Sequence, residues 1–312
     1  MLSHITPSVL TALGGVLGIL VVASLIAALL KRLHPDKNYT ELIQRIRSWW
    51  IMIGIFSGAI LLSRTASILF FAFVSFLALK EYVSLIPTRR ADRRVLFWAY
   101  AAIPFQYYWV HEQWYGMFII FIPVYLFLLL PMRMVIIGET KDFLRAAGTL
   151  HWGLMTMVFS LSHAAFFLVL DGARNPAGGG AGLVLYLIFL TQFNDVAQYV
   201  WGKLTGRHKI IPKVSPNKTW EGFLGGVGTT TALAMVLAPY LTPLTLVESL
   251  GAGLLIALGG FIGDVTISAL KRDIGVKDSG SLLPGHGGIL DRIDSLTYTA
   301  PLLFHFVYYL HY

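Results

Sequence analysis

Residues 8–30 read SVLTALGGVLGILVVASLIAALL, an apolar run that contains no charged side chain. A hydrocarbon core about 30 Å thick is crossed by roughly 20 helical residues, so this stretch is long enough to span a membrane. It is too long for the apolar part of a cleaved signal peptide, and no basic segment precedes it. We therefore expect the run to stay in the protein as its first transmembrane helix.

The rest of the chain has the same apolar character. Of its 312 residues, 56% are hydrophobic and 13% are charged, whereas about 25% of residues are charged in an average soluble protein. A soluble core cannot hold that much apolar surface, so much of it must face lipid. Further candidate spans are 48–63, 66–79, 95–110, 114–137, 149–170, 181–201, 222–241, 249–268 and 295–312. We predict an all-α, polytopic membrane protein of about ten spans, with the second and third spans paired as a helical hairpin.

Basic residues indicate how these spans are oriented. Of the 24 lysines and arginines, all but Arg64 and Arg174 lie in loops that follow odd-numbered spans or, for Arg133, at the frayed end of such a span. Because basic loops stay in the cytoplasm, we expect both termini outside and the basic loops inside a bacterial inner membrane. Topology and anionic lipid headgroups explain the net charge of +8 without a nucleic-acid partner.

Acidic residues divide the chain into two regions. We interpret residues 1–180, with six spans, as a membrane scaffold, because their histidines and charges show no ligand spacing. We interpret residues 181–312 as a catalytic region, because carboxylates lie there inside or at the ends of apolar segments. These are Asp195, Asp264, Asp291 and Asp294. A carboxylate within a membrane is costly unless it is paired, hydrated or metal-bound, so each is a functional candidate.

These carboxylates are predicted near the cytoplasmic ends of their spans. Asp291 and Asp294 are three residues apart and share one helix face if the last span has begun there. Hard carboxylate oxygens suit Mg²⁺, which also binds polyphosphate oxygens. We therefore predict Asp264 and Asp291 as metal ligands, whereas Asp195 either binds the metal or orients a nearby lysine.

A first basic loop lies before the eighth span at the same depth as the acids. Its candidate residues are Lys203, Lys209, Ser215, Lys218 and Thr219. A cluster of hydroxyl and ammonium groups just before a helix N-terminus can hold an anion. We expect this loop to bind phosphate groups.

A second basic loop precedes the last span. Glycines around Pro284 and His286 leave backbone N–H groups free to face phosphate oxygens. Three basic residues of this loop can neutralise the charge of a departing pyrophosphate. They are Lys271, Arg272 and Lys277. For His286 three roles stay open: a base, a phosphate contact or a support for the backbone.

Residues 268–294 combine these acids, bases and glycines in one pattern. It reads Ser-x-x-Lys-Arg, four residues, Lys-Asp-x-Gly, then Pro-Gly-His-Gly-Gly-x-x-Asp-Arg-x-Asp. This pattern resembles, without a gap, the signature of the phosphatidate cytidylyltransferase (CDP-diglyceride synthase) family. Upstream runs also match that family's motifs: Asp195-Val-Ala, Gly202-Lys203, Gly206-Arg207 and Ser215–Gly222. The resemblance covers about residues 190–295.

The resemblance implies that CTP and phosphatidate, or a related lipid phosphate, give CDP-diacylglycerol and pyrophosphate with Mg²⁺. The residues to which we assign catalytic roles are Asp264, Asp291, Lys218, Lys277 and Arg272. Those assigned to substrate binding are Ser215, Lys203, Lys209, Thr219, Lys271, Asp278, His286 and Arg292. The metal ligands are assigned as Asp264, Asp291, Asp294 and Asp195. A second metal ion and a homodimer stay open, and membrane lipid is the expected surrounding partner.

Two positions depart from the family pattern. Gln198 stands where an aromatic residue is usual, and Ile267 stands before Ser268 where an acid is common. A divergent paralogue that acts on another lipid phosphate therefore stays open. So does a CTP-dependent polyprenol or dolichol kinase, which would use similar groups but release CDP. A transporter would instead place polar groups through the full membrane depth, whereas here they gather on one side.

Overall fold

Helices dominate the fold. The computed structural model describes the chain apart from residues 1–4, 35, 37 and 281–286. The α-helices are α1 (Pro7–Leu33), α2 (Thr40–Leu62), α3 (Arg64–Leu85), α4 (Arg93–His111), α5 (Tyr115–Ile120), α6 (Phe127–Ile137), α7 (Phe143–Leu154), α8 (Leu161–Phe166), α9 (Gly179–Thr205), α10 (Trp220–Leu241), α11 (Leu246–Asp273), α12 (Leu290–Ile293) and α13 (Leu296–His311). Within the described residues the β-strands form one antiparallel pair, β1 (Lys209–Ile211) and β2 (Ser215–Thr219). The all-α prediction is confirmed.

Shorter helical turns complete two of the long helices. The π-helical turns η2 (Phe121–Leu126) and η3 (Met155–Ser160) join α5 to α6 and α7 to α8. Pro123 lies within η2. Proline has no backbone N–H to donate, and the wider π-helical turn tolerates the missing hydrogen bond. The 3-10 turns are η1 (Arg90–Asp92), η4 (Phe167–Val169) and η5 (Gly172–Arg174).

Eight helical stretches in the described part of the chain are long and apolar enough to cross a membrane. They are Pro7–Leu33, Thr40–Leu62, Arg64–Leu85, Tyr115–Ile137, Phe143–Val169, Gly179–Thr205, Trp220–Leu241 and Leu246–Asp273. A chain with so many apolar helices is a polytopic membrane protein, as predicted. The other two predicted spans correspond to α4 and α13, which lie outside these eight, and α13 has 16 residues. The total number of spans therefore stays a prediction.

The predicted helical hairpin of the second and third spans is confirmed, with longer helices than expected. α2 begins eight residues before the predicted start at residue 48, and α3 continues past the predicted end at residue 79. Ser63 separates the two helices, and its Oγ accepts a hydrogen bond from the Ala66 N–H at 3.0 Å. A serine here satisfies a backbone donor that the first helical turn leaves free.

α9 is the central helix of the C-terminal region and packs against α10, α11 and α13. Asn194 of α9 links two of these neighbours: its Nδ2 donates to Ala257 O at 3.2 Å, and its Oδ1 accepts from Thr230 Oγ1 at 3.2 Å. A Cβ at Gly222 would lie 2.7 Å from the Gln198 carbonyl oxygen, so only glycine allows α10 to approach α9 this closely. Two of these helices carry five of the predicted site residues, Asp195 and Lys203 on α9 and Asp264, Lys271 and Arg272 on α11, and they are held tightly together.

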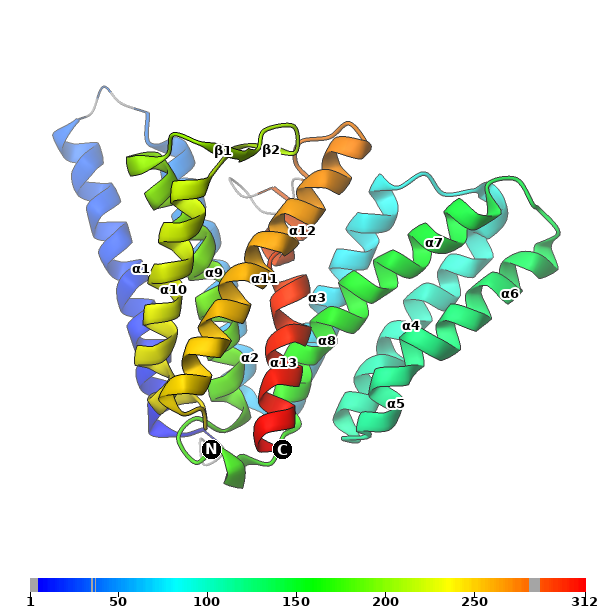
Figure 1. Cartoon of the computed structure of the whole chain (residues 1–312), viewed down its shortest axis with the longest axis horizontal. Helices are drawn as coiled ribbons and strands as arrows, with labels where there is room; N and C mark the ends of the chain where they lie inside the picture. Colours follow the sequence, from blue (N-terminus) through cyan, green and yellow to red (C-terminus); the bar gives the residue numbers. More distant parts are fainter. Residues whose placement is uncertain (1–4, 35, 37, 281–286) are drawn as a thin grey trace.

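The two ends of the molecule carry different features (Figure 1). α1 begins and α13 ends at one end, whereas β1, β2 and α12 lie toward the opposite end. α9 and α11 run toward that second end, and α10 starts from it. Both termini at one end agree with an even number of crossings. The predicted site residues therefore gather at the end away from the termini.

Candidate active site

A pocket of about 480 Å³ lies between α9, the β1–β2 hairpin, α10 and α11. Its lining includes these predicted site residues: Asp195, Lys203, Lys209, Ser215, Lys218, Thr219 and Asp264. They come from segments up to about 70 residues apart in the sequence, and the packing around α9 brings them to one place. The first basic loop and two of the intramembrane acids therefore face the same pocket.

Lys218 and Asp264 form an ion pair in this pocket. Lys218 Nζ on β2 lies 2.5 Å from Asp264 Oδ2 on α11. The other carboxylate oxygen, Oδ1, accepts from Ser268 Oγ at 3.2 Å. Lys218 also donates to Gln198 Oε1 at 3.2 Å, so the residue that departs from the family pattern orients this lysine. The ammonium group supplies the positive charge next to Asp264.

Lys271 and Asp291 form a second, more buried pair. Lys271 Nζ donates to Asp291 Oδ1 at 2.7 Å. Asp291 Oδ2 accepts from Ser279 Oγ at 2.9 Å and from the N–H groups of Ser279 and Gly288, each at 3.0 Å. Burial raises the pKa of the Asp291 carboxyl, but Lys271 and the N–H donors lower it by more. The net shift of the pKa is downward, so Asp291 is ionised at neutral pH.

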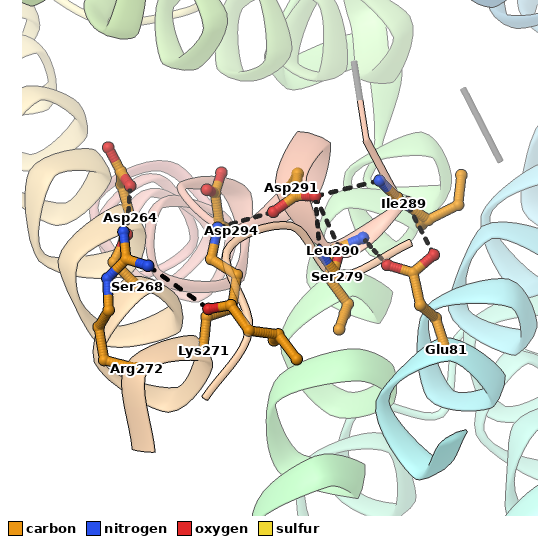
Figure 2. Close-up of polar contacts among 12 residues, drawn as sticks. Glu81, Asp264, Ser268, Lys271, Arg272, Ser279, Ile289, Leu290, Asp291 and Asp294 are labelled. Atoms are coloured by element: carbon orange, nitrogen blue, oxygen red, sulfur yellow. Dashed lines mark hydrogen bonds and ion pairs between the residues drawn. The ribbon is translucent and has the colours of Figure 1, made fainter. Parts of the chain in front are cut away.

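Asp195 and Asp294 are joined through Ser295. Ser295 Oγ donates to Asp195 Oδ2 at 3.0 Å, and the Ser295 N–H donates to Asp294 Oδ1 at 2.8 Å. Burial raises the pKa of the Asp294 carboxyl well above its ordinary value, and the charges of Asp264 and Asp195 raise it further. Figure 2 shows Asp294 between Asp264 and Asp291. A cation bound here would relieve the repulsion among these carboxylates.

The donor set suits Mg²⁺ in chemistry but is not gathered into a ligand cluster. Within the described residues, no three His, Asp or Glu side chains are arranged to hold one metal ion. Asp264 and Asp291 each face a lysine instead. Carboxylate oxygens are nevertheless the ligands that Mg²⁺ takes, together with waters and phosphate oxygens. The predicted metal ligands thus fit the ion in kind, and their roles stay predictions.

Other predicted residues of the first loop have structural contacts. Thr219 Oγ1 accepts from the Gly222 N–H at 3.2 Å and caps α10. Lys209 pairs with Thr219 across the two strands, and Ser215 with Ile211. Lys203 Nζ lies 5.9 Å from the centre of the Tyr199 ring. The short hairpin therefore fixes where this loop's side chains enter the pocket.

The second loop is described in part. Arg272 Nε donates to Val214 O at 3.2 Å, which ties α11 to the hairpin. The Arg292 carbonyl accepts from Gln192 Nε2 at 3.1 Å. Lys277 and Asp278 are exposed beside Ser279. His286 lies outside the described residues, and its predicted role is untested.

Glu81 of α3 is a contributor that the sequence interpretation missed. Its carboxylate accepts the N–H groups of Ile289 at 2.9 Å and Leu290 at 3.0 Å (Figure 2). These two residues lie just before Asp291. Glu81 was included in the scaffold with the rest of residues 1–180, whose charged residues show no ligand spacing. The sequence interpretation also assigned no role to the serines that hold the carboxylates; they are Ser268, which begins the 268–294 pattern, Ser279 and Ser295.

The chain is similar to known proteins over most of its length. Residues 43–310 match the family model described as "Cytidylyltransferase family". An uncharacterized protein, YnbB of Escherichia coli K12, is 46% identical over 96% of this chain and 98% of its own length. A phosphatidate cytidylyltransferase of Staphylococcus aureus is 42% identical over 125 residues, 40% of this chain and 48% of that enzyme. One of Staphylococcus saprophyticus is 36% identical over 49% of this chain and 59% of the enzyme. The matches to these phosphatidate cytidylyltransferases thus span only about half of the length of each enzyme.

Proposed function

The chain belongs to the cytidylyltransferase family, and from that premise we propose that it transfers the cytidylyl group of CTP to phosphatidate. The products are CDP-diacylglycerol and pyrophosphate. The observation that carries the proposal is the convergence of Asp195, Asp264 and Lys218 on one pocket, together with the ion pair between Lys271 of α11 and Asp291 of α12. A polyphosphate and a divalent cation require such a mixture of bases and acids.

The position of the pocket suits one soluble and one lipid substrate. Lys203 and Lys209 at its rim offer positive charge to a nucleotide that arrives from water. Tyr199 also lines the pocket and is 67% exposed, so the pocket has an apolar edge open to its surroundings. A lipid phosphate can therefore approach from the bilayer while its acyl chains stay in the membrane.

In the proposed reaction a phosphate oxygen of the acceptor attacks the α-phosphorus of CTP. A new P–O bond forms, the bond to the β-phosphate oxygen breaks, and pyrophosphate leaves with its electron pair. The attacking oxygen is already anionic and needs little help from a base, so the protein's tasks are alignment and charge neutralisation. Lys218 and Lys271 pair with carboxylates in this structure. In the proposed reaction the two lysines turn to phosphate oxygens when the carboxylates bind a metal ion instead. Lys277 and Arg272 add positive charge near the leaving group.

Mg²⁺ is the proposed cofactor. The residues that would hold it are Asp264 and Asp291, supported by Asp195 and Asp294. When bound, the ion neutralises phosphate oxygens as charge develops on the leaving pyrophosphate. Ser268, Ser279 and Ser295 keep the carboxylates oriented toward the site.

We propose that the pocket faces the cytoplasm of a bacterial inner membrane. The distribution of basic residues supports this orientation, as does the separation between the termini and the β1–β2 hairpin (Figure 1). Residues 1–180 then form the scaffold and residues 181–312 the catalytic region. Glu81 extends the scaffold's role to contact with the site.

A labelled-substrate assay tests the proposal. Purified protein is incubated with CTP labelled at the α-phosphorus, Mg²⁺ and phosphatidate, and label is expected in the lipid phase with release of pyrophosphate. Label that appears in lipid only from the γ-position, with release of CDP, would identify a lipid kinase instead. Substrate flux into proteoliposomes without nucleotide consumption would indicate a transporter.

The same assay tests the acceptor. Gln198 departs from the family pattern and contacts Lys218, so acceptor lipids are compared directly. Phosphatidate is compared with a polyprenyl phosphate and with lysophosphatidate at equal surface concentration. Higher turnover with either alternative would replace phosphatidate as the substrate and leave the reaction type in place.

A further inference from the structure

Glu81 contacts a segment of the second loop that follows 208 residues later in the chain. Its Oε2 accepts the Ile289 N–H at 2.9 Å, and its Oε1 accepts the Leu290 N–H at 3.0 Å. Both carboxylate oxygens are therefore used on two consecutive amides. In the described part of the chain Glu81 makes no ion pair, so the hydrogen bonds from these two N–H groups stabilise its carboxylate.

Two glycines let the loop pack around this carboxylate. A Cβ at Gly288 would overlap both the Glu81 carboxylate and Ser279 Oγ. A Cβ at Gly280 would lie 3.1 Å from Glu81 Oε2. Gly280 and Gly288 thus both lie against the Glu81 side chain of α3. Any larger residue at position 288 would displace that side chain.

The same stretch of backbone also binds Asp291. The Gly288 N–H donates to Asp291 Oδ2, and the next two N–H groups along the chain donate to Glu81 (Figure 2). Two carboxylates therefore bind three successive amides, and one of the two is a proposed metal ligand. If the Glu81 contacts are lost, the amides of Ile289 and Leu290 lose their acceptors, and the position of Asp291 is no longer fixed from that side.

On the basis of the proposed cytidylyl transfer, we infer that Glu81 is a positioning residue for the active site. It holds residues 288–290 so that Asp291 and Lys271 keep the arrangement that binds metal and phosphate. Because α3 belongs to the scaffold, this contact makes the N-terminal region a part of the catalytic arrangement. Removal of a group that hydrogen-bonds to and orients a metal-binding residue commonly lowers activity or metal affinity about 10- to 100-fold.

The test compares Glu81→Gln with Lys80→Gln. Lys80 is the exposed neighbour of Glu81 on the same helix, so its variant controls for a charge change at this place. Glu81→Gln is expected to lower turnover about 10- to 100-fold and to raise the Mg²⁺ concentration needed for half-maximal activity. Glu81→Asp keeps both acceptor oxygens and is expected to retain more activity than Glu81→Gln. Lys80→Gln should match the unaltered protein.

Hydrogen exchange measured by mass spectrometry gives a second readout that needs no activity. Peptides that cover residues 287–295 should exchange faster in Glu81→Gln than in the unaltered protein and in Lys80→Gln. A merely structural role would lower the active fraction and leave the Mg²⁺ requirement unchanged, and that result would overturn the inference. So would unchanged exchange at residues 289 and 290.

Failure of the proposed function would look different. If the unaltered protein transfers no cytidylyl group to any lipid phosphate, the function falls, whatever Glu81 does. The exchange comparison still decides whether Glu81 holds the loop, and Mg²⁺-dependent protection of the 287–295 peptides still reports on its link to the metal. Loss of that protection in Glu81→Gln supports the inference, and its persistence overturns it.

Discussion

The two basic loops are each held by a glutamate, but the two glutamates come from different parts of the chain. In the first loop, Glu221 Oε2 accepts the N–H groups of Arg207 at 3.0 Å and His208 at 3.2 Å, and Oε1 lies 2.6 Å from His208 Nδ1. In the second loop, Glu81 accepts two consecutive N–H groups from 208 and 209 residues away. The first anchor is local, and its His208 partner is exposed, whereas the second couples two regions of the protein.

The positions of the two loops therefore depend on different parts of the protein. A local anchor forms as soon as its own loop and helix fold, so changes in it should stay within the first loop. A remote anchor forms only when the N-terminal and C-terminal regions have packed together. Damage to either region should therefore reach the second loop, and the variants below measure whether it does.

Metal removal should have the largest effect, because the proposed ion serves both loops. Treatment of the purified protein with a chelator is expected to reduce cytidylyl transfer to background, and added Mg²⁺ should restore it. The measurement is label from α-labelled CTP in the lipid phase before and after Mg²⁺ is returned. Full turnover in the presence of chelator would mean that the carboxylates act only as partners of Lys218 and Lys271.

Asp264→Asn and Asp291→Asn should each reduce turnover about 100-fold or more, since each removes a charge that stabilises the reacting groups. The comparison between them tests the two loops. Asp291→Asn also weakens the acceptor of Ser279 and Gly288 and leaves Lys271 buried without its partner. Hydrogen exchange should therefore increase in residues 287–295 for Asp291→Asn and stay unchanged there for Asp264→Asn. Equal exchange in both variants would remove the distinction.

Gly288→Ala should come next, with a loss of about 10- to 100-fold. The added methyl group overlaps the Glu81 carboxylate and has to push the loop away from α3. Gly228→Ala is the matched control, because a Cβ at Gly228 meets nothing within 4 Å. If Gly288→Ala has the turnover and Mg²⁺ requirement of the control, the loop does not depend on close contact with α3.

Glu221→Gln should have the smallest effect, about threefold on the KM for CTP, because exposed ion pairs contribute little. Turnover at saturating CTP and the Mg²⁺ requirement should stay as in the unaltered protein. Steady-state kinetics at several CTP concentrations measure both quantities. If Glu221→Gln lowers turnover as much as Glu81→Gln does, the local and the remote glutamate contribute equally to activity, and the proposed difference between the two loops is wrong.

Most of the fold could be predicted from periodic and compositional signals. Apolar stretches such as residues 8–30 are visible without any structure, because crossing a membrane sets a length and excludes charge. Helix ends were harder: α2 begins well before its apolar core does, since amphipathic residues near a membrane surface continue a helix that hydropathy alone cuts short. The β1–β2 hairpin was not foreseen, because its few residues lie among polar loop residues.

The site could be predicted where residue type and depth in the membrane agree. Asp264 and Lys218 share a depth and opposite charge, and the structure pairs them. What sequence could not give is which lysine meets which acid, since that depends on the packing of α9, α10 and α11. Glu81 was beyond reach for the same reason. Nothing in its local sequence indicates a partner more than 200 residues away.

The pairing of Lys218 with Asp264 also bears on how the chain enters the bilayer. An isolated ionised carboxylate near the end of α11 is expensive to bring into hydrocarbon, whereas a neutral pair is much cheaper. The partner lysine is supplied by the strand that directly precedes α10, so both charges leave the ribosome within about fifty residues of each other. Biogenesis of this region is thus expected to favour release of α10 and α11 into lipid together, as a helical pair whose charges already cancel.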